Sequence, residues 1–396
     1  MKNRFTAIKT MCAILCISLT ASCAVEKSET PIHIPFTFEN DRIIVNATIN
    51  GQEGRFIFHS GITHIATEIK PHSLFPIGFT KRVINGRNKF VLVYKTNSIQ
   101  FGDTTVKVRA PLVNEGDWLH ELREEEAVDG VLGTNAFEGY WMELSFARNE
   151  IVLHSTKPEH FSNHVPLKAM SKNEPLYAPV NVDGKDVYMS ISTGMPEAFL
   201  FPNGLIKNKG GIIKEVETNG ALKVHIVETS TVSTLDDVFR DKFILTFSSL
   251  VATRNFASRN NLGIMGIYFM RYYDFLFDYR DIRRGKTSGM YYKPITDIGE
   301  TKDLGLFSFL DELPSVGIIN FAITTEGLEV DSVMKDSEAY TVYNVRPGSV
   351  ITKINGQDIA SIPREWLNFL LSFEDIESFS MLNEAREEVT YRIKTE

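Results

Sequence analysis

Cysteine is scarce in this chain, and no apolar run beyond the N-terminus is long enough to cross a membrane as a helix. Three cysteines in 396 residues exclude a fold held together by a disulfide framework. The formal net charge is −8, so the basic excess typical of nucleic-acid-binding proteins is missing. With 43% hydrophobic residues, the chain has enough apolar side chains for two or three folded domains. We therefore expect a soluble multi-domain protein with no nucleic-acid partner.

The usual cofactor and metal motifs are also missing. The sequence has no Gly-x-Gly-x-x-Gly or Walker loop, so nothing supports a nucleotide cofactor. His154, His160 and His164 cluster, and the last two have the spacing of one helix face. No His-Glu-x-x-His motif or paired cysteines accompany them, and Pro158 and Asn163 favour a linker between domains. We expect neither a cofactor nor a metal site.

The first 22 residues resemble a secretory signal. Three basic residues precede an apolar stretch at residues 11–19, and small residues follow it. Cys23 comes directly after the small residues, which resembles a bacterial lipobox in which this cysteine becomes the lipidated first residue. Residues 23–31 would then tether the protein to a membrane of the bacterial envelope, in the periplasm or at the outer membrane. The alternative is ordinary signal cleavage that leaves Cys23 as a free thiol.

A duplicated pattern occupies most of the remaining chain. Residues 43–61 and residues 176–194 both consist of two apolar runs joined by a turn that ends in glycine. Gly130 and Gly263 each begin a Gly-x-x-Gly segment, and these segments lie 133 residues apart, as the paired runs do. The spacing predicts two copies of one unit, at residues 32–160 and 161–298.

Both copies are predicted to be rich in β-strands. Asn50-Gly51 and Asp183-Gly184 separate alternating apolar runs, which is typical of β-hairpins. Asn85-Gly86 and Asn219-Gly220 indicate a second hairpin at nearly the same place in each copy. The aromatic-rich sequence after each Gly-x-x-Gly segment predicts a helical turn followed by a strand.

The second apolar run of each copy ends in a polar-hydroxyl-glycine tripeptide. These tripeptides are His59-Ser60-Gly61 and Ser192-Thr193-Gly194. Such a strand end, followed about 70 residues later by Gly-apolar-apolar-Gly, resembles the retropepsin-like aspartic peptidases. Two fused copies resemble the bilobed, pepsin-like arrangement with an active cleft between the lobes. The resemblance covers about residues 32–297 and implies a mainly β fold of two tandem acid-protease lobes.

The chain departs from this family at the catalytic positions. The family places aspartate first in each tripeptide, and the two carboxyl groups share one proton and activate a water. His59 and Ser192 stand at these positions, and a serine hydroxyl is neither an acid nor a base at neutral pH. Ser60 and Thr193 keep the hydroxyls that brace the two loops in the family. The shared-proton mechanism cannot operate with these residues.

Three functions remain open for this degenerate pair. In the first, the pair fills the contact between the lobes, and the protein binds extended polypeptide without cutting it. In the second, the protein is a peptidase, with His59 as base and Ser192 as nucleophile or with an acid from a partner subunit. In the third, the protein is a structural scaffold with a collapsed cleft. Asp129 and Asp278 lie outside the tripeptides, and we expect turn or solvated roles for them. We favour binding over catalysis.

Residues 300–396 have a different pattern. Residues 327–333 alternate as a strand, residues 350–359 form a strand, a turn and an apolar return, and residues 366–371 have helical spacing. This order, with the Val-Arg-Pro-Gly segment that ends at Gly348, resembles a bacterial PDZ domain. Such a domain has an α+β fold.

The PDZ resemblance implies a second peptide site. A PDZ domain captures an extended peptide as an added strand, and a loop of backbone amides holds the terminal carboxylate. The best match for this loop is Val316-Gly317-Ile318-Ile319, so Gly317, Ile318 and Ile319 are the residues expected to bind peptide. The alternative is a spacer that packs on the lobes with its groove filled. Because two fused lobes do not require a partner copy, we expect a monomer.

Overall fold

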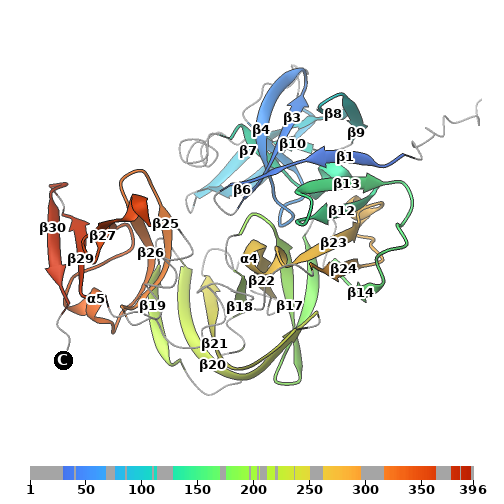
Figure 1. Ribbon diagram of the computed structural model, residues 1–396. Helices are drawn as coiled ribbons and strands as arrows, with labels where there is room; N and C mark the ends of the chain where they lie inside the picture. The colour runs from blue at the N-terminus through green and yellow to red at the C-terminus, as the bar shows by residue number, and fades with distance from the viewer. Residues whose placement is uncertain are drawn as a thin grey trace, which may run out of the picture.

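The computed structural model describes most of the chain, with gaps. The described residues are 30–39, 42–67, 76–84, 87–108, 111–113, 128–169, 175–195, 198–202, 205, 212–218, 222–235, 237–249, 262–295, 316–362, 376–383 and 385–393. Within these residues the fold is mainly β, as the sequence predicts, and the helices are at most four residues long (Figure 1). The signal, Cys23 and the helix expected at residues 366–371 lie outside the described residues, so these three remain predictions.

The first sheet belongs to the first repeat, residues 32–160. Its described strands are β2 (Thr37–Glu39), β3 (Arg42–Ile49), β4 (Gln52–Phe58), β5 (Ile65–Thr67), β6 (Gly78–Ile84), β7 (Arg87–Lys95), β8 (Ser98–Phe101), β9 (Thr104–Lys107), β10 (Pro111–Val113) and β11 (Gly130–Leu132). They are ordered β6-β7-β10-β5-β11-β4-β3-β8-β9, with β2 added to β3. β6 is therefore the last described strand at one edge.

The second sheet begins in the second repeat, residues 161–298, and continues into the C-terminal unit, residues 316–393. The strands of the repeat are β15 (Lys168–Ala169), β16 (Leu176–Val182), β17 (Lys185–Ser192), β18 (Phe199–Pro202), β19 (Lys214–Thr218), β20 (Leu222–Thr234), β21 (Asp237–Ser249) and β22 (Leu262–Gly266). The elements of the C-terminal unit are β25 (Ile318–Ile323), β26 (Leu328–Met334), α5 (Glu338–Thr341), β27 (Val350–Ile354), β28 (Gln357–Asp358), a 3₁₀ turn at Ile359–Ser361, β29 (Ser378–Leu382) and β30 (Glu388–Arg392). One ladder, between β19 and β26, joins the two parts.

The third sheet is shared equally between the repeats. Its order in the described chain is β1 (Ile32–Pro35), β13 (Glu150–His154), β12 (Trp141–Ser145), β23 (Tyr273–Asp278), β24 (Met290–Pro294) and β14 (Asn163–Val165). The first three strands come from the first repeat and the last three from the second. β12 and β23 meet antiparallel at the centre, with Met142 opposite Phe277, so this sheet has an approximate twofold axis between them.

The helical turns follow the Gly-x-x-Gly segments, as the sequence predicts. A 3₁₀ turn at Thr134–Phe137 precedes β12, and α4 (Ile267–Met270) precedes β23. A further 3₁₀ turn lies at Ile282–Arg284. Among the described residues, no helix is long and apolar enough to span a bilayer.

The two repeats have the same strand register. Phe58 pairs with Leu132 in the parallel ladder of β4 and β11, and Ile191 pairs with Met265 in that of β17 and β22. The offset between corresponding partners is 133 residues, the separation found in the sequence. Pairing in the same register requires the same side-chain alternation, because a slip by one residue would reverse the faces of a strand. The duplication found in the sequence is therefore also present in the structure.

The predicted hairpin turns are present. Asn50 and Gly51 have φ values of 54° and 79°, and Asp183 and Gly184 have values of 49° and 77°. Two successive residues with positive φ are typical of the two-residue hairpin turn that Asn-Gly and Asp-Gly favour. The Asn85-Gly86 and Asn219-Gly220 turns lie outside the described residues, but the strands on either side of each turn pair with one another.

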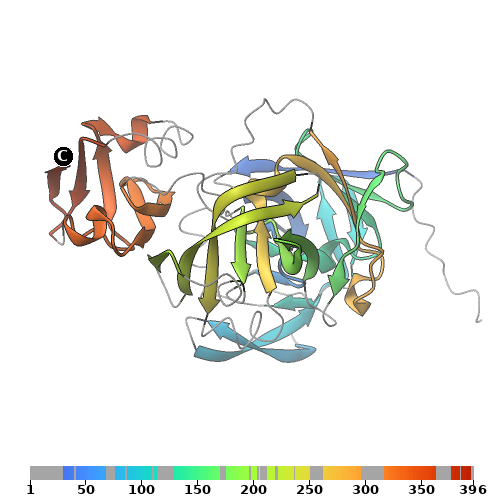
Figure 2. The ribbon, with the colours of Figure 1, turned by 90° about the horizontal axis from the view of Figure 1, so that it is seen from below.

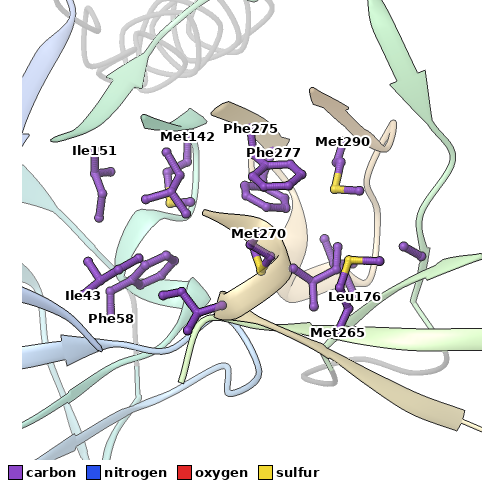
Figure 3. Close-up of a cluster of buried hydrophobic side chains, with 14 of the residues drawn as sticks. Ile43, Phe58, Met142, Ile151, Leu176, Met265, Met270, Phe275, Phe277 and Met290 are labelled. Carbon is purple, nitrogen blue, oxygen red and sulfur yellow. The ribbon is translucent and has the colours of Figure 1, made fainter. Parts of the chain in front are cut away.

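A single apolar core lies under the shared sheet. Figure 3 shows side chains of this sheet, among them Met142, Phe275 and Phe277, directed toward residues of both repeats. Phe58 lies on the first-repeat side and Met265 on the second-repeat side of this core. The same apolar cluster includes residues of both repeats. Separating the repeats would therefore expose buried apolar surface, which costs roughly 25 cal/mol of free energy per Å². The core thus holds the two tripeptide loops in a constant relative position.

The C-terminal unit is attached to a hairpin of the second repeat. β19 pairs with β26, with Val216 opposite Met334, and Figure 1 shows the two strands side by side. Lys335 N donates to Glu215 O at 3.1 Å, and Lys214 forms an ion pair with Asp336. We call the buried residues at this contact the junction cluster: Leu200, Val216, Val224, Ile226, Leu245, Ile319 and Met334. Figure 2 shows the C-terminal unit at one end of the molecule, beyond the strands of the second repeat.

Candidate functional site: the contact between the two tripeptides

The two tripeptides follow corresponding strands and face each other. β4 ends at Phe58 immediately before His59-Ser60-Gly61, and β17 ends at Ser192, the first residue of Ser192-Thr193-Gly194. β11 pairs in parallel with β4, and β22 pairs in parallel with β17. Each of these two partner strands is followed by a helical turn. His59 N donates to Leu132 O at 3.0 Å, which fixes the start of the first loop against β11.

Two hydroxyl side chains lock the loops together. Ser60 N donates to Thr193 Oγ1 at 3.0 Å, and Thr193 N donates to Ser60 Oγ at 3.0 Å. Each hydroxyl then donates to a carbonyl of the opposite repeat, Ser60 Oγ to Ile191 O at 2.8 Å and Thr193 Oγ1 to Phe58 O at 2.7 Å. Both side chains are buried, so these four bonds replace water that the loops have lost. The bracing role expected for Ser60 and Thr193 is present.

The imidazole of His59 fills the space between the two glycines. A β-carbon on Gly194 would lie 2.2 Å from His59 Cδ2, and one on Gly61 would lie 2.6 Å from His59 Cε1. The same β-carbon on Gly61 would lie 2.8 Å from Ser192 Oγ, so the ring and the hydroxyl are close neighbours. Both tripeptides therefore need glycine at their third position because the side chains at the first positions occupy that volume.

His59 is a neutral ring with its proton on Nε2. Gly61 N donates to His59 Nδ1 at 3.0 Å, which leaves Nδ1 as an acceptor and assigns the proton to Nε2. Burial is the largest cause that lowers the pKa of His59 to about 3; the basic side chains of Arg42 and His64 act in the same direction, and a backbone hydrogen bond opposes them. The imidazole is therefore uncharged at any pH near neutrality.

This tautomer cannot act as the base of a His59–Ser192 dyad. A general base must present an unprotonated nitrogen to the nucleophile, and the only unprotonated nitrogen of His59 is occupied by the amide of Gly61. Among the described residues, no hydrogen bond joins the ring to the Ser192 hydroxyl, although the two are neighbours. The geometry brings the two predicted residues together without the orientation that catalysis needs.

Sequence reasoning missed Arg42 at this site. Its Nη1 donates to Gly194 O from the start of β3, so a cation of the first repeat binds the tripeptide of the second. The residue also contributes to the lowered pKa of His59. An arginine at the first position of a β-strand carries no recognisable signal in the sequence, because only the tertiary contact between the repeats brings it to Gly194.

The two aspartates considered as substitute acids serve other roles. Asp129 Oδ2 accepts from Arg55 N at 2.9 Å, which is a contact with strand β4. Of the turn or solvated role expected for Asp278, the solvated role is wrong, because the residue is 4% exposed and forms an ion pair with Arg280. Its Oδ1 also accepts from Arg280 N two residues on, as the turn role predicts. Hydrogen bonds from Arg280 and Ser288 lower its pKa to about 2 despite burial. A carboxyl group held ionised in this way cannot share a proton.

His154 and His160 lie beside the carboxylate of Glu143. His164 contacts the backbone carbonyl of Ser288 instead, and none of the three histidines lies on a helix. His164 is in strand β14 and His160 precedes it, so the alternative of one helix face for the two is wrong. His154 Nε2 lies 2.8 Å from Glu143 Oε2, and Arg148 Nη2 donates to Glu143 Oε1 at 2.5 Å. These hydrogen bonds lower the pKa of Glu143 to about 2, although burial opposes them. In the described chain, no three His, Cys, Asp or Glu side chains gather as metal ligands.

Of the three residues expected to bind peptide in the C-terminal unit, Gly317 directly precedes β25, and Ile318 and Ile319 are its first two residues. Gly317 has φ = 83°, its carbonyl accepts from Met334 N at 2.7 Å, and a β-carbon there would lie 2.1 Å from Ser337 Cβ. Ile318 is buried in the core of the C-terminal unit, and Ile319 is buried in the junction cluster. The side chains of both isoleucines are therefore in use, and only the backbone edge of β25 opposite β26 is left without a strand among the described residues.

One face of the β6–β7 hairpin carries exposed apolar side chains. Tyr94 packs against the main core, and Leu92 and Phe90 follow on the same face because side chains alternate along a strand. Phe79 lies opposite Leu92 in the ladder and contacts Phe90 edge-on, with ring centroids 5.5 Å apart. Phe79 and Phe90 are each 70% exposed, and Ile77 beside them is 64% exposed. The face thus extends beyond the core without a covering layer in the described chain.

Comparison with protein-family models found no match, and comparison with the curated proteins also found none.

Proposed function

We propose that this chain is a lipid-anchored protein of the bacterial envelope that binds extended polypeptide without cutting it. In this proposal two retropepsin-like lobes have lost their catalytic acids and are followed by a PDZ domain. Cys23 carries the lipid anchor, and the protein acts as a monomer. The proposed binding surfaces are the interlobe cleft near His59 and Ser192, the exposed apolar face of the β6–β7 hairpin, and the backbone edge of β25.

The symmetry of the molecule supports the lobe assignment. The two repeats share one strand register, contribute three strands each to a common sheet, and lock their tripeptides by reciprocal hydrogen bonds. A fold that keeps its loop-bracing hydroxyls while its acids are replaced is consistent with a peptidase scaffold that has lost its chemistry. Fold similarity by itself does not establish a function.

The observation that carries the binding proposal is the exposed apolar face of the β6–β7 hairpin. Ile77, Phe79, Phe90 and Leu92 form one contiguous face beside β6, which has no further strand at its outer edge within the part of the chain that the structure describes. An extended chain can add to such an edge through main-chain hydrogen bonds while apolar side chains pack on the face. Exposed apolar groups of this kind on a folded protein mark interaction surfaces.

The tautomer of His59 favours binding over a His59–Ser192 peptidase, because the base would need Nδ1 or Nε2 free of a proton and of other bonds. The scaffold alternative has one specific observation in its favour. Ile319, at the mouth of the proposed peptide site, is packed in the junction cluster, as a spacer domain would require. The second backbone edge of β25, which pairs with no strand among the described residues, favours binding, since a spacer does not need an unpaired edge.

Fluorescence anisotropy with a labelled, extended apolar decapeptide tests the proposal. We expect binding to residues 24–396, and at least tenfold weaker binding when Phe79→Asp and Phe90→Asp are combined. Val238→Asp is the matched control, because Val238 is also apolar and 58% exposed but lies on β21. Equal binding by the double variant and the native protein would contradict this surface assignment.

A cleavage assay separates binding from catalysis. Incubation of an unfolded protein substrate between pH 3 and pH 7 is expected to leave it intact. Pepstatin-sensitive cleavage that His59→Ala abolishes would instead establish the peptidase alternative.

A further inference from the structure

The β6–β7 hairpin combines its exposed apolar face with a local excess of basic residues. From residue 69 to residue 102 the sequence has lysine and arginine but no aspartate or glutamate, in a chain with 50 acidic residues and a net charge of −8. The basic residues on the two strands are Lys81, Arg82, Arg87, Lys89 and Lys95. The positive charge is therefore a feature of this hairpin and not of the chain as a whole.

The strand register separates the apolar residues from most of the basic ones. Directly opposite residues of an antiparallel ladder share a face, and successive residues of a strand alternate between faces. Phe79 and Leu92 are opposite each other on the apolar face. Arg82 and Lys89 are also opposite each other, three residues further along each strand, so this pair falls on the other face. Lys95 is three residues from Leu92 and falls on that second face too, where it is exposed.

The pair of Arg82 and Lys89 has no acidic residue beside it in the hairpin. Like charges directly opposite each other destabilise a ladder, whereas opposite charges stabilise it. Beyond β6 no further strand follows among the described residues. A strand added there would place its own residues next to Arg82 on the same face. An acidic residue at that point would supply the missing counter-charge.

We propose that the β6–β7 hairpin binds an extended polypeptide in which apolar and acidic residues alternate. This inference rests on the proposed peptide-binding function and names the class of polypeptide that the hairpin selects. Every second residue of a strand added to β6 lies on the face of Phe79 and Phe90, where apolar side chains can pack because both rings are 70% exposed. The intervening residues lie on the face of Arg82 and Lys89, where carboxylates complement the positive charge.

Two other occupants fit this surface less well. A second copy of the chain would bring its own basic hairpin, and basic residues on an edge strand oppose the pairing of two like edges. An anionic membrane would attract both the charge and the exposed rings. It would leave the outer backbone groups of β6, which pair with no strand in the described chain, without partners in hydrocarbon. An acidic polypeptide meets the apolar face, the charge and the backbone edge together.

Three labelled decapeptides with the same alternating apolar residues test the selection. The intervening positions carry glutamate, glutamine or lysine, and fluorescence anisotropy measures binding to residues 24–396. At low ionic strength we expect the glutamate peptide to bind at least tenfold more tightly than the glutamine peptide, and the lysine peptide to bind most weakly. Added salt should reduce these differences, because it screens exposed charges.

The outcome separates this inference from the proposed function. Equal binding of the glutamate and glutamine peptides would overturn the inference and leave peptide binding intact. If none of the three peptides binds, the proposed function fails together with it.

Charge reversal identifies the residues that select the peptide. Arg82→Glu combined with Lys89→Glu should reverse the preference, so that the lysine peptide binds more tightly than the glutamate peptide. Arg82→Gln combined with Lys89→Gln should bind the glutamine peptide as the native protein does and lose the advantage of the glutamate peptide. Lys107→Glu combined with Lys185→Glu is the matched control, because both lysines are exposed on other strands, β9 and β17. A native preference in either hairpin variant would contradict the assignment.

Two measurements decide the other occupants. Sedimentation with vesicles of phosphatidylcholine and phosphatidylserine is expected to leave the protein without Cys23 in the supernatant. Vesicle binding that Arg82→Gln and Lys89→Gln together abolish, with equal affinity for the glutamate and glutamine peptides, would assign the hairpin to a membrane surface. A dimer in sedimentation equilibrium that Phe79→Asp dissociates would assign it to a second copy. Either result would overturn the proposal.

Discussion

Ser60 and Thr193 exchange equivalent hydrogen bonds across the two repeats, with the amide of each residue donating to the hydroxyl of the other at 3.0 Å. Both residues are almost fully buried. The exchange links the two halves of the molecule at the residues next to His59 and Ser192. The second residue of each tripeptide therefore fixes how the two loops lie. Substitutions at the first positions, His59 and Ser192, need not change that arrangement.

Removing one hydroxyl from this exchange should be costly. Thr193→Val keeps the shape of the side chain but leaves Ser60 N without its acceptor in a buried place. A buried donor without a partner costs about 1–3 kcal/mol, so we expect a lower free energy of unfolding by about 2 kcal/mol. Thermal unfolding measures this change, with Thr105→Val on the exposed side of β9 as control. Equal losses for both variants would contradict the bracing role.

The contact of Gly194 with the His59 ring predicts that substitutions at these two positions have non-additive effects on the free energy of unfolding. Gly194→Ala places a β-carbon 2.2 Å from His59 Cδ2, so the ring must move and we expect a loss of about 1–3 kcal/mol. Combining it with His59→Ala removes the clash, and the second substitution should then cost much less. Gly78→Ala is the control, because a β-carbon there meets nothing within 4 Å. Additive losses in the double variant would contradict the contact.

The lowered pKa of His59 predicts the pH range in which the ring is protonated and how the stability of the fold depends on pH. Since the folded-state pKa of His59 is about 3 and the usual value is 6.5, the ring should stay neutral from pH 8 to pH 5. The neutral ring contributes stability that is complete above about pH 6.5 and is lost as the pH falls toward 3. The ¹⁵N shifts of the ring nitrogens measure its protonation directly. A midpoint near pH 6.5 would show that the ring is not held as described.

Glu143 is a second source of acid sensitivity. Its pKa of about 2 lies below the usual 4.5, so its stabilising effect is present above about pH 4.5 and is lost as the pH falls toward 2. Glu143→Gln leaves Arg148 and His154 without the charge that they contact and should lower the free energy of unfolding by about 3 kcal/mol at pH 7. It should also flatten the decline of stability between pH 5 and pH 2.

Denaturant unfolding at several pH values measures both effects of Glu143→Gln. Glu53→Gln, at an exposed position of β4, is the control and should leave the curve unchanged. A variant that keeps the native pH dependence would show that other carboxylates dominate it.

The junction cluster predicts that the C-terminal unit can be released by one substitution. Val216 is 5% exposed and lies opposite Met334 in the β19–β26 ladder. Val216→Asp buries a charge without a partner in this apolar contact, which favours separation of the two parts. We expect a larger radius of gyration in small-angle scattering, with Val342→Asp, at a 64% exposed position, as control. An unchanged scattering curve would show that other contacts hold the unit.

Much of the architecture follows from local patterns. The mainly β class, the Asn50-Gly51 turn and the strand at residues 328–334 depend on side-chain alternation and turn chemistry, which neighbouring residues carry. The repeat is visible because corresponding residues keep a constant separation. Patterns of this kind fail where the partner is distant: the sequence favoured a linker around His160 and His164, and His164 lies instead in a strand that pairs with β24.

The sequence by itself determined that an imidazole and a hydroxyl stand at the first positions of the two tripeptides, since residue identity needs no fold. Only the tertiary structure decided which nitrogen of His59 carries the proton, that Arg42 reaches Gly194, and that β26 takes the edge of β19. The physical reason is that these outcomes depend on contacts between segments more than one hundred residues apart, or on a side-chain orientation set by close packing. Neither leaves a periodic trace in the order of residues.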